Sequence, residues 1–466
     1  MSGEVLLRGV ELHPRQDPVD CRIRGGAVVE IGRRLRPRPD EFVVRGDGGA
    51  LLPGLADHHL HLAAMAARRA SLDVSPLSRH GLASSVAQAV AGEDGWVRAV
   101  GYDDVVHGDL DRSVLDGWNR VLPVRVQHRS GALWVVNSPG LERLGALAAA
   151  HAGIERERTG RPTGRLWRAD AWLREVLGGR PPSLRAVGAR LAALGVTHVA
   201  DATPDQGAGH LVSEAVRREE LPQHIMTMAA DAGLPPHPRL SIGPLKFVVA
   251  DHALPDVDDL AGRMRQAHTN GRPVAVHCVT RTALALTLAA LDRAGGLDGD
   301  RVEHCAVADR AGAAELAARG IRVVTQPTLV ALRGDDYWER VDPADRPDLW
   351  RYAGLLHAGV RVAASSDAPY GDPDPWAGLR AAAERLTPSG RVLGADERVP
   401  VEVALRSMFS PLDDPGGPAR RIAVGRPADL VLLDRPWSEA VRAPDAGHVR
   451  ATFIEGRIAH GAQQLG

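Results

Sequence analysis

Side chains able to bind divalent metal ions recur where short apolar segments of this sequence end. The first such segment closes with Asp-His-His-Leu-His, residues 57–61. Side chains alternate between the two faces of a strand, so His59 and His61 share a face with Asp57, while His58 points to the other face and packs. Two imidazoles at this spacing form a pair of the kind that divalent metals favour, although the pair alone is a weak signal.

Four later segments end in side chains of the same kind. Lys246 and His277 lie 31 residues apart, and His277 and His304 lie 27 apart, each about one strand-helix unit. Asp367 follows His304 by 63 residues, which is two units. Structural histidines would not fall so regularly at strand ends. We therefore predict a metal centre with six ligands from five strands: His59, His61, Lys246, His277, His304 and Asp367.

The lysine is unusual because it is the only one in the chain, the other 56 of the 57 basic residues being arginine. Arginine replaces lysine at most surface positions, but its guanidinium cannot lose its proton and react. A lysine left by chance in an arginine-rich sequence is the alternative. The position of Lys246 at a strand end favours a chemical role.

Composition narrows the classes of protein and partner. The chain has 466 residues with a net charge of −1, 44% apolar and 25% charged residues, as in an ordinary globular protein. We expect neither nucleic acid nor a membrane as partner, because there is no basic excess and no apolar run of 18 residues. The first residues do not resemble a signal peptide, and three cysteines cannot form a disulfide framework, so we expect a cytoplasmic protein.

Apolar segments alternate with helical stretches through the middle of the chain, which predicts a parallel sheet in an α/β fold. Eight segments with short crossovers favour a (β/α)8 TIM barrel, whose active sites lie at the carboxyl ends of the strands. Between the first and second segments the gap is far too long for one helix, which predicts an insertion. The eight segments are 51–60, 197–201, 225–229, 244–250, 273–278, 301–305, 322–326 and 361–365.

The order of candidate ligands resembles the amidohydrolase superfamily: His-x-His on the first strand, lysine on the fourth, histidine on the fifth and sixth, and aspartate on the eighth. The wider chain is similar to amidohydrolase family 3, the branch that includes N-substituted formamide deformylases. This likeness covers essentially the whole chain. Its matching segments are 52–57, 101–103, 136–138, 161–164, 195–197, 326–327, 365–369 and 424–430.

The resemblance implies a division of the chain around the barrel. Residues 1–55 and 413–466 would form the two parts of a small β-sandwich, in agreement with β-branched runs near both ends. Residues 56–64 would end the first barrel strand, and 184–412 would form the rest of the barrel. Residues 65–183, with a strand-like segment at 121–126, would be an insertion that caps the active site.

The resemblance also implies the chemistry of the centre. Lys246 would be carboxylated by CO2, so that its carbamate could bridge one or two divalent ions, most simply zinc. His59, His61 and Asp367 would hold the more buried ion, and His277 and His304 the more exposed one. Metal-bound hydroxide would then attack a carbonyl carbon, with Asp367 as general base and then general acid.

Three departures from the family pattern lie in expected substrate-facing loops. Ala132 stands where a histidine is usual, Arg168 where an acidic residue is usual, and Thr280-Arg281 where Gly-Asp is frequent. Two added arginines would suit an anionic substrate. Our candidate substrate-binding residues are His128, Arg168, Arg281 and Trp338.

These observations lead to three hypotheses of function. The first is a metal-dependent hydrolase of a non-peptide C–N bond, acting on a small-molecule linear N-acyl or N-formyl amide. The second keeps the same metal site but opens a cyclic amide or deaminates a heterocycle. The third, a metal-free barrel that serves as a scaffold, predicts the loss of at least one ligand, and none is missing. The sequence does not decide the oligomeric state, and a homodimer is one possibility.

Overall fold

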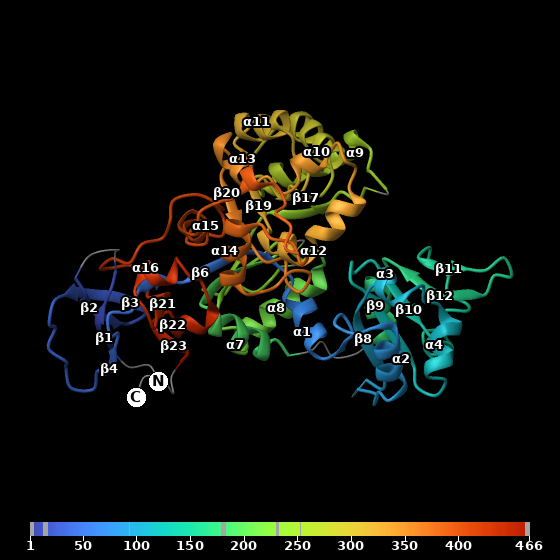
Figure 1. The fold of residues 1–466 in the computed structure, drawn as a ribbon, viewed down its shortest axis with the longest axis horizontal. Coiled ribbons are helices and arrows are strands. Elements are labelled where there is room, and N and C mark those ends of the chain that lie inside the picture. The colour runs from blue at the N-terminus through green and yellow to red at the C-terminus, as the bar shows by residue number, and fades with distance from the viewer. Residues whose placement is uncertain are drawn as a thin grey trace. The chain divides into compact units, whose positions relative to one another are not determined.

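The computed structural model describes residues 4–12, 17–92, 94–178, 183–229, 233–251 and 253–461 (Figure 1). The chain divides into two compact units. The first, the main unit, comprises Met1–Leu62 and Leu184–Gly466, and the second comprises Ala63–Ser183. No helix within the described ranges is long and apolar enough to cross a membrane.

Two parallel sheets form the centre of the main unit. Each of the eight predicted segments contains a strand, and β6, β18, β19 and β20 are buried along their whole length, as expected of parallel sheets covered on both faces. One sheet has the order β15-β14-β13-β6 and the other β16-β17-β18-β19-β20. The strands are β6 (Leu55–Leu60), β13 (Val196–Asp201), β14 (His224–Thr227), β15 (Leu240–Ile242), β16 (Leu245–Val248), β17 (Val274–Cys278), β18 (Arg301–His304), β19 (Arg322–Thr325) and β20 (Val362–Ala364).

Helices follow these strands, and side-chain caps fix where several of them begin. Asp205, Asp256, Thr280, Asp309 and Asp374 each accept a hydrogen bond from a first-turn N–H group. The helices are α7 (Arg185–Ala193), α8 (Gln206–Arg217), α9 (Val257–Thr269), α10 (Arg281–Ala294), α11 (Arg310–Ala318), α12 (Pro327–Arg340), α13 (Tyr352–His357), α14 (Pro375–Glu384), α15 (Val401–Ser407) and α16 (Trp437–Ala440).

The two ends of the chain build two four-stranded sheets side by side, blue and red in Figure 1. Their orders are β3-β2-β1-β4 and β23-β22-β21-β5, and one hydrophobic cluster, which includes Leu7, Ile23, Leu430 and Phe453, joins them. This arrangement agrees with a sandwich made from both ends. The strands are β1 (Val5–Val10), β2 (Val19–Arg24), β3 (Ala27–Gly32), β4 (Phe42–Arg45), β5 (Leu51–Pro53), β21 (Leu430–Leu433), β22 (Val449–Ile454) and β23 (Arg457–His460).

The unit Ala63–Ser183 has a mixed sheet of its own, in the order β11-β12-β10-β9-β8-β7. The sequence predicts a strand-like segment at 121–126, whereas β9 starts at Val124, and the sheet contains five further strands. Its strands are β7 (Leu72–Asp73), β8 (Val97–Tyr102), β9 (Val124–His128), β10 (Leu133–Val136), β11 (Ile154–Arg156) and β12 (Pro162–Trp167). Its helices are α2 (Arg79–Ala87), α3 (Asp104–His107), α4 (Arg112–Trp118), α5 (Ser138–Arg143) and α6 (Asp170–Leu177), and α1 (Leu62–Arg69) leads into it.

Candidate metal centre

Three of the six predicted ligands converge at the carboxyl end of β6. His59 Nε2 lies 3.5 Å, and His61 Nε2 lies 3.4 Å, from Asp367 Oδ1. One ligand atom from each of the three residues lies within 4.8 Å of the others, so the group could hold a metal ion. Two imidazoles and a carboxylate are a donor set that suits zinc and similar divalent ions.

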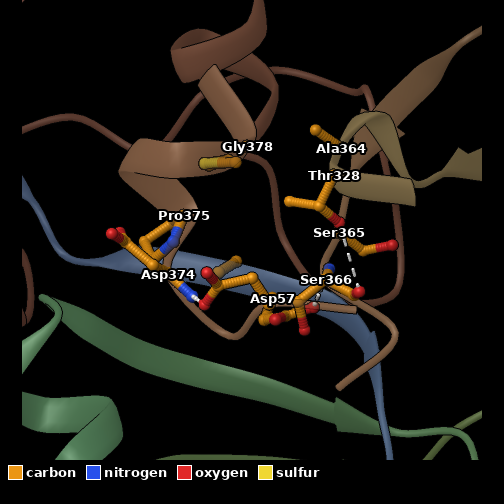
Figure 2. A pocket seen from close by; sticks show the side chains of 11 residues that line it. Asp57, Thr328, Ala364, Ser365, Ser366, Asp374, Pro375 and Gly378 are labelled. Atoms are coloured by element: carbon orange, nitrogen blue, oxygen red, sulfur yellow. Dashed lines mark hydrogen bonds between the residues drawn. The ribbon is translucent and has the colours of Figure 1, made fainter. Parts of the chain in front are cut away.

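Backbone and side-chain hydrogen bonds hold the segment after β20 against β6. The Asp367 N–H donates to the carbonyl of His59 (2.8 Å), and the His61 N–H donates to the carbonyl of Ala368 (2.8 Å). Asp57 Oδ1 accepts from the N–H groups of His59 (3.1 Å) and Ser366 (3.2 Å), and Figure 2 shows Asp57 beside Ser366 at the wall of a small pocket. Asp57 therefore braces the two ligand-bearing segments.

Two further histidines extend the group. The ring centroids of His59 and His304 are 4.8 Å apart, and those of His304 and His277 are 4.5 Å apart. His304 is buried, whereas His277 is partly exposed. Both lie at the ends of adjacent parallel strands, where Cys278 pairs with His304. The structure thus brings all four predicted histidines into one connected cluster.

Lys246 is buried in β16, next to the strand that carries His277. Among the described residues its Nζ has no hydrogen-bond partner. Burial lowers the pKa of Lys246 to about 8, although the carboxylate of Glu303 opposes this shift. A buried amine without a partner, close to imidazoles and a carboxylate, fits the carbamate ligand that the resemblance implies.

Three of the imidazoles are oriented through Nδ1, which directs Nε2 to the centre. The Nδ1 partners are Glu303 for His59, Thr203 Oγ1 for His61 (3.0 Å) and Gln326 Oε1 for His304 (2.8 Å). Such partners fix the tautomer of metal-binding histidines.

Contacts beyond these partners identify each Nδ1 as a donor. Thr203 donates its hydroxyl proton to Asp201 (2.7 Å), so its oxygen is left to accept from His61. The amide nitrogen of Gln326 donates to Ser365 Oγ (2.9 Å), which turns the amide oxygen to His304. A carboxylate such as Glu303 can only accept. Each Nε2 therefore carries a lone pair that is available to a cation.

The charges of these groups suit cation binding. Burial lowers the pKa of His59 to about 3 and that of His277 to about 2, so both rings are neutral at pH 7. For Asp367, burial raises the pKa, but the polar contact with His61 and the neighbouring imidazoles lower it more, and the net shift is downward. Neutral imidazoles and an ionised carboxylate are the forms that bind metals.

The backbone is left-handed at two of the candidate ligands. The φ angles are 69° at His304 and 55° at Asp367, and Cys305 follows at 50°. Non-glycine residues rarely adopt this conformation, and it concentrates at functional sites. The strained backbone at the ends of β18 and β20 thus sets the direction of these two side chains.

Sequence reasoning missed Glu303, Thr203 and Gln326, the residues that orient the histidines. One signal was present for Glu303, because a glutamate inside a strand expected to be buried must find a polar partner. Thr203 lies two residues after β13 and Gln326 directly follows β19, but threonine and glutamine near strand ends are too common to stand out.

Two predicted substrate-binding residues lie in the unit Ala63–Ser183. His128, at the end of β9, contacts Ser130 Oγ (2.8 Å) through Nδ1 and Asp104 Oδ1 (3.1 Å) through Nε2. Arg168 follows β12 with a φ of 47°, and its N–H donates to the carbonyl of Ala132 (2.7 Å). Their contact with substrate stays a prediction.

The other two substrate-binding candidates lie in the main unit. Arg281 opens α10, four residues after His277, and forms ion pairs with Asp309, Asp345 (2.8 Å) and Asp348 (2.7 Å). A substrate anion would have to compete with these three carboxylates, which gives Arg281 a role in joining three loops.

Trp338, on α12, is 38% exposed, and its ring contacts the guanidinium groups of Arg346 and Arg391 at 5.0 and 4.6 Å. These contacts leave part of the indole accessible. Its role in substrate binding stays a prediction.

The class of protein that this site defines is a metal-dependent hydrolase, with histidine and aspartate ligands at the carboxyl ends of parallel strands. The sequence profile of the amidohydrolase family matches residues 46–460. The chain therefore belongs to the amidohydrolase family, in the family 3 branch, as the sequence predicted. It is a hydrolase that acts on carbon–nitrogen bonds.

Individual relatives agree with this assignment. An N-substituted formamide deformylase from Arthrobacter pascens is 25% identical, over 93% of each chain. A Bacillus subtilis (strain 168) protein named as an amidohydrolase, YtcJ, is 24% identical, over 83% of this chain and 84% of its own. The crystal structure of an uncharacterized metal-dependent hydrolase from Pyrococcus horikoshii OT3 shares the fold, with a TM-score of 0.74 and 18% identity over 96% of this chain and 99% of that one.

Proposed function

We propose that this enzyme hydrolyses a linear N-acyl or N-formyl amide of a small molecule. The observation that carries the proposal is the convergence of His59, His61 and Asp367 beside a buried amine that has no partner among the described residues. The likeness to an N-substituted formamide deformylase supports a linear amide over a ring. His277 and His304 complete the proposed ligand set.

A divalent ion, most simply zinc, would polarise the carbonyl of the substrate and lower the pKa of water when bound. The protein side chains carry out the rest. His59, His61, His277 and His304 would hold the cation through their ring nitrogens. Asp367 stays ionised, accepts the proton of the attacking water and returns it to the departing nitrogen, which leaves as a neutral amine.

Carboxylation of Lys246 by CO2 would supply the remaining ligand. The nitrogen of a neutral amine attacks CO2 and loses one proton, so a cationic side chain becomes an anionic one with two oxygen ligands. Burial favours the neutral amine, since the lowered pKa brings deprotonation within reach of neutral pH. The carbamate could then serve one ion or bridge two.

We propose that the two parallel sheets are halves of one (β/α)8 barrel, in which β15 and β16, separated only by Gly243 and Pro244, are two parts of one strand. Hydrogen bonds cross both seams between them: Lys246 N–H donates to the carbonyl of Met228 (3.2 Å), and Asp367 N–H to that of His59 (2.8 Å). Residues 65–183 would cap the mouth of this barrel. A homodimer in the cytoplasm remains part of the proposal.

A substrate panel and metal analysis test this function together. Purified enzyme should contain one to two equivalents of zinc or a similar ion, and it should release free acid or formate from linear N-substituted amides. Release of ammonia from heterocycles, or opening of cyclic amides without action on linear ones, would contradict the proposed substrate class. Less than about 0.2 equivalents of metal would favour a scaffold.

The carbamate is tested by a variant and its rescue. Lys246→Ala removes the bridging ligand, so activity should fall by about 10²-fold or more, and small carboxylic acids such as acetate or propionate should restore part of it. Wild-type activity in the unrescued variant would rule out the carbamate.

A further inference from the structure

Glu303 lies directly behind one of the proposed metal ligands. It is fully buried in β18, and one carboxylate oxygen contacts His59 Nδ1 from a strand 244 residues away in the sequence. Its other oxygen accepts a hydrogen bond from Arg301 Nε (2.5 Å). Arg301 is itself held by the carbonyls of His58 (3.0 Å) and Leu412 (3.3 Å).

We propose that Glu303 is the positioning residue that makes His59 a strong metal ligand, a role that rests on the metal centre of the proposed function. A carboxylate accepts but does not donate, so it keeps the proton of His59 on Nδ1 and the lone pair on Nε2. Its negative charge also raises the donor strength of the ring, as carboxylates behind metal-binding histidines do. Arg301 balances this buried charge and prevents the carboxylate from turning away.

The three oriented histidines differ in the charge of their partners. Nδ1 of His61 donates to a hydroxyl and Nδ1 of His304 donates to an amide, both of which are neutral. Nδ1 of His59 donates to a carboxylate, which is an anion. A charge-assisted hydrogen bond is about twice as strong as a neutral one. Of the three, His59 should therefore be the ligand whose binding depends most on its partner.

Replacement by glutamine is a sharp test because it changes the hydrogen-bonding role with little change in volume. Arg301 can only donate hydrogen bonds, so the amide oxygen of the new side chain will turn toward Arg301 and accept from it. The amide NH2 then faces His59 Nδ1 and can only donate to it. This forces the proton of the ring onto Nε2, where it blocks metal binding.

The experiment uses Co²⁺ as the probe, added to full-length protein that has been stripped of metal. Glu303→Gln should weaken Co²⁺ binding by about 10- to 100-fold and alter the visible spectrum of the bound ion. The matched control is Glu397→Gln, since Glu397 is also buried and pairs with an arginine, Arg351 (3.0 Å), while its other oxygen accepts from the N–H of Gly354 (2.6 Å) rather than from a proposed ligand. The control should keep Co²⁺ affinity within about twofold while losing thermal stability.

Each outcome tests a different property of the site. Wild-type affinity in Glu303→Gln, or an equal loss in Glu397→Gln, would overturn the positioning role and leave the metal centre intact. Failure of the wild-type protein to bind Co²⁺ would overturn the metal centre and the positioning role together. Should Glu303→Gln not fold, Glu303→Asp keeps the charge but withdraws it from Nδ1, and unchanged affinity in that variant would equally refute the proposal.

Discussion

The main unit holds two clusters of two histidines and one aspartate that look alike in composition. His59, His61 and Asp367 form the first, toward the carboxyl ends of the parallel strands. His198, His224 and Asp429 form the second, toward the amino ends of β13 and β14. In both, one ligand atom from each residue lies within 4.8 Å of the others. Composition and proximity alone do not separate them.

The two clusters differ because the second already contains a cation, the guanidinium of Arg420. In the second cluster Arg420 Nη1 donates to His198 Nδ1 (2.8 Å), while Nη2 donates to the carbonyl of Gly54 (2.6 Å). His224 Nε2 contacts Asp429 (3.2 Å), and the two imidazoles stack with centroids 4.7 Å apart. Stacked rings do not direct their lone pairs to one point, and the guanidinium already supplies the positive charge.

A metal-competent cluster therefore needs more than suitable side chains. At the first cluster, partners on Nδ1 aim the Nε2 lone pairs inward, and the neighbouring amine of Lys246 can be converted to an anion. The second cluster is a closed network that ties Asp429, at the start of β21, to two strands of the parallel sheet. We expect the first to determine chemistry and the second to determine stability.

Replacement of the aspartate in each cluster should give the largest difference in catalytic efficiency. Asp367→Asn should lower kcat/KM by about 10³-fold, because the amide cannot accept the proton of the attacking water. Asp429→Asn should leave kcat/KM within about threefold. Steady-state kinetics on the best amide substrate measures both, and a comparable loss in the two variants would remove the distinction between the clusters.

Metal content separates the same clusters without reference to activity. His61→Ala deletes a proposed ligand and should lower bound zinc at least tenfold after dialysis against a weak chelator. His224→Ala should retain the metal content of the wild-type protein. Elemental analysis of both proteins decides the matter, and loss of metal from His224→Ala would show that the second cluster also binds an ion.

Sequence spacing could predict the ligands because strands of a parallel sheet end at a common edge. His59, His277 and His304 fall near strand ends, with His277 and His304 about one strand-helix unit apart. Alternation correctly set His58 apart, which is buried and contacts Ser410 (3.1 Å). Spacing could not predict the partner of His59, because that contact joins residues 244 apart and depends on side-chain packing. Nor could it predict the sheet of residues 63–183, most of whose strands are short or interrupted by glycine.

The guanidinium of Arg420 should contribute mainly to the stability of the fold. Arg420→Met removes the buried hydrogen bonds from the guanidinium to His198 and to the carbonyls of Gly54 and Phe409, so the free energy of unfolding should fall by about 3 kcal/mol. Arg218→Met, at an exposed ion pair with Glu214, should change it by less than about 0.5 kcal/mol. Urea denaturation measures both, and kcat should stay near the wild-type value in each. Equal stability of the two variants would contradict the role given to Arg420.

A pH titration of stability gives the smallest and most specific effect. Burial, together with the charges of Arg420, His224 and His58, lowers the pKa of His198 well below its usual range. The unfolded chain therefore binds a proton near pH 6.5 that the folded chain does not, and stability falls as the pH drops through that value. His198→Asn keeps an oxygen that can accept from Arg420 but cannot be protonated.

Between pH 7.5 and pH 5 the free energy of unfolding of the wild-type protein should fall by about 2 kcal/mol more than that of this variant, as urea denaturation at each pH would measure. Parallel losses would mean that His198 already carries a proton in the folded protein, and that the guanidinium beside it does not keep the ring neutral.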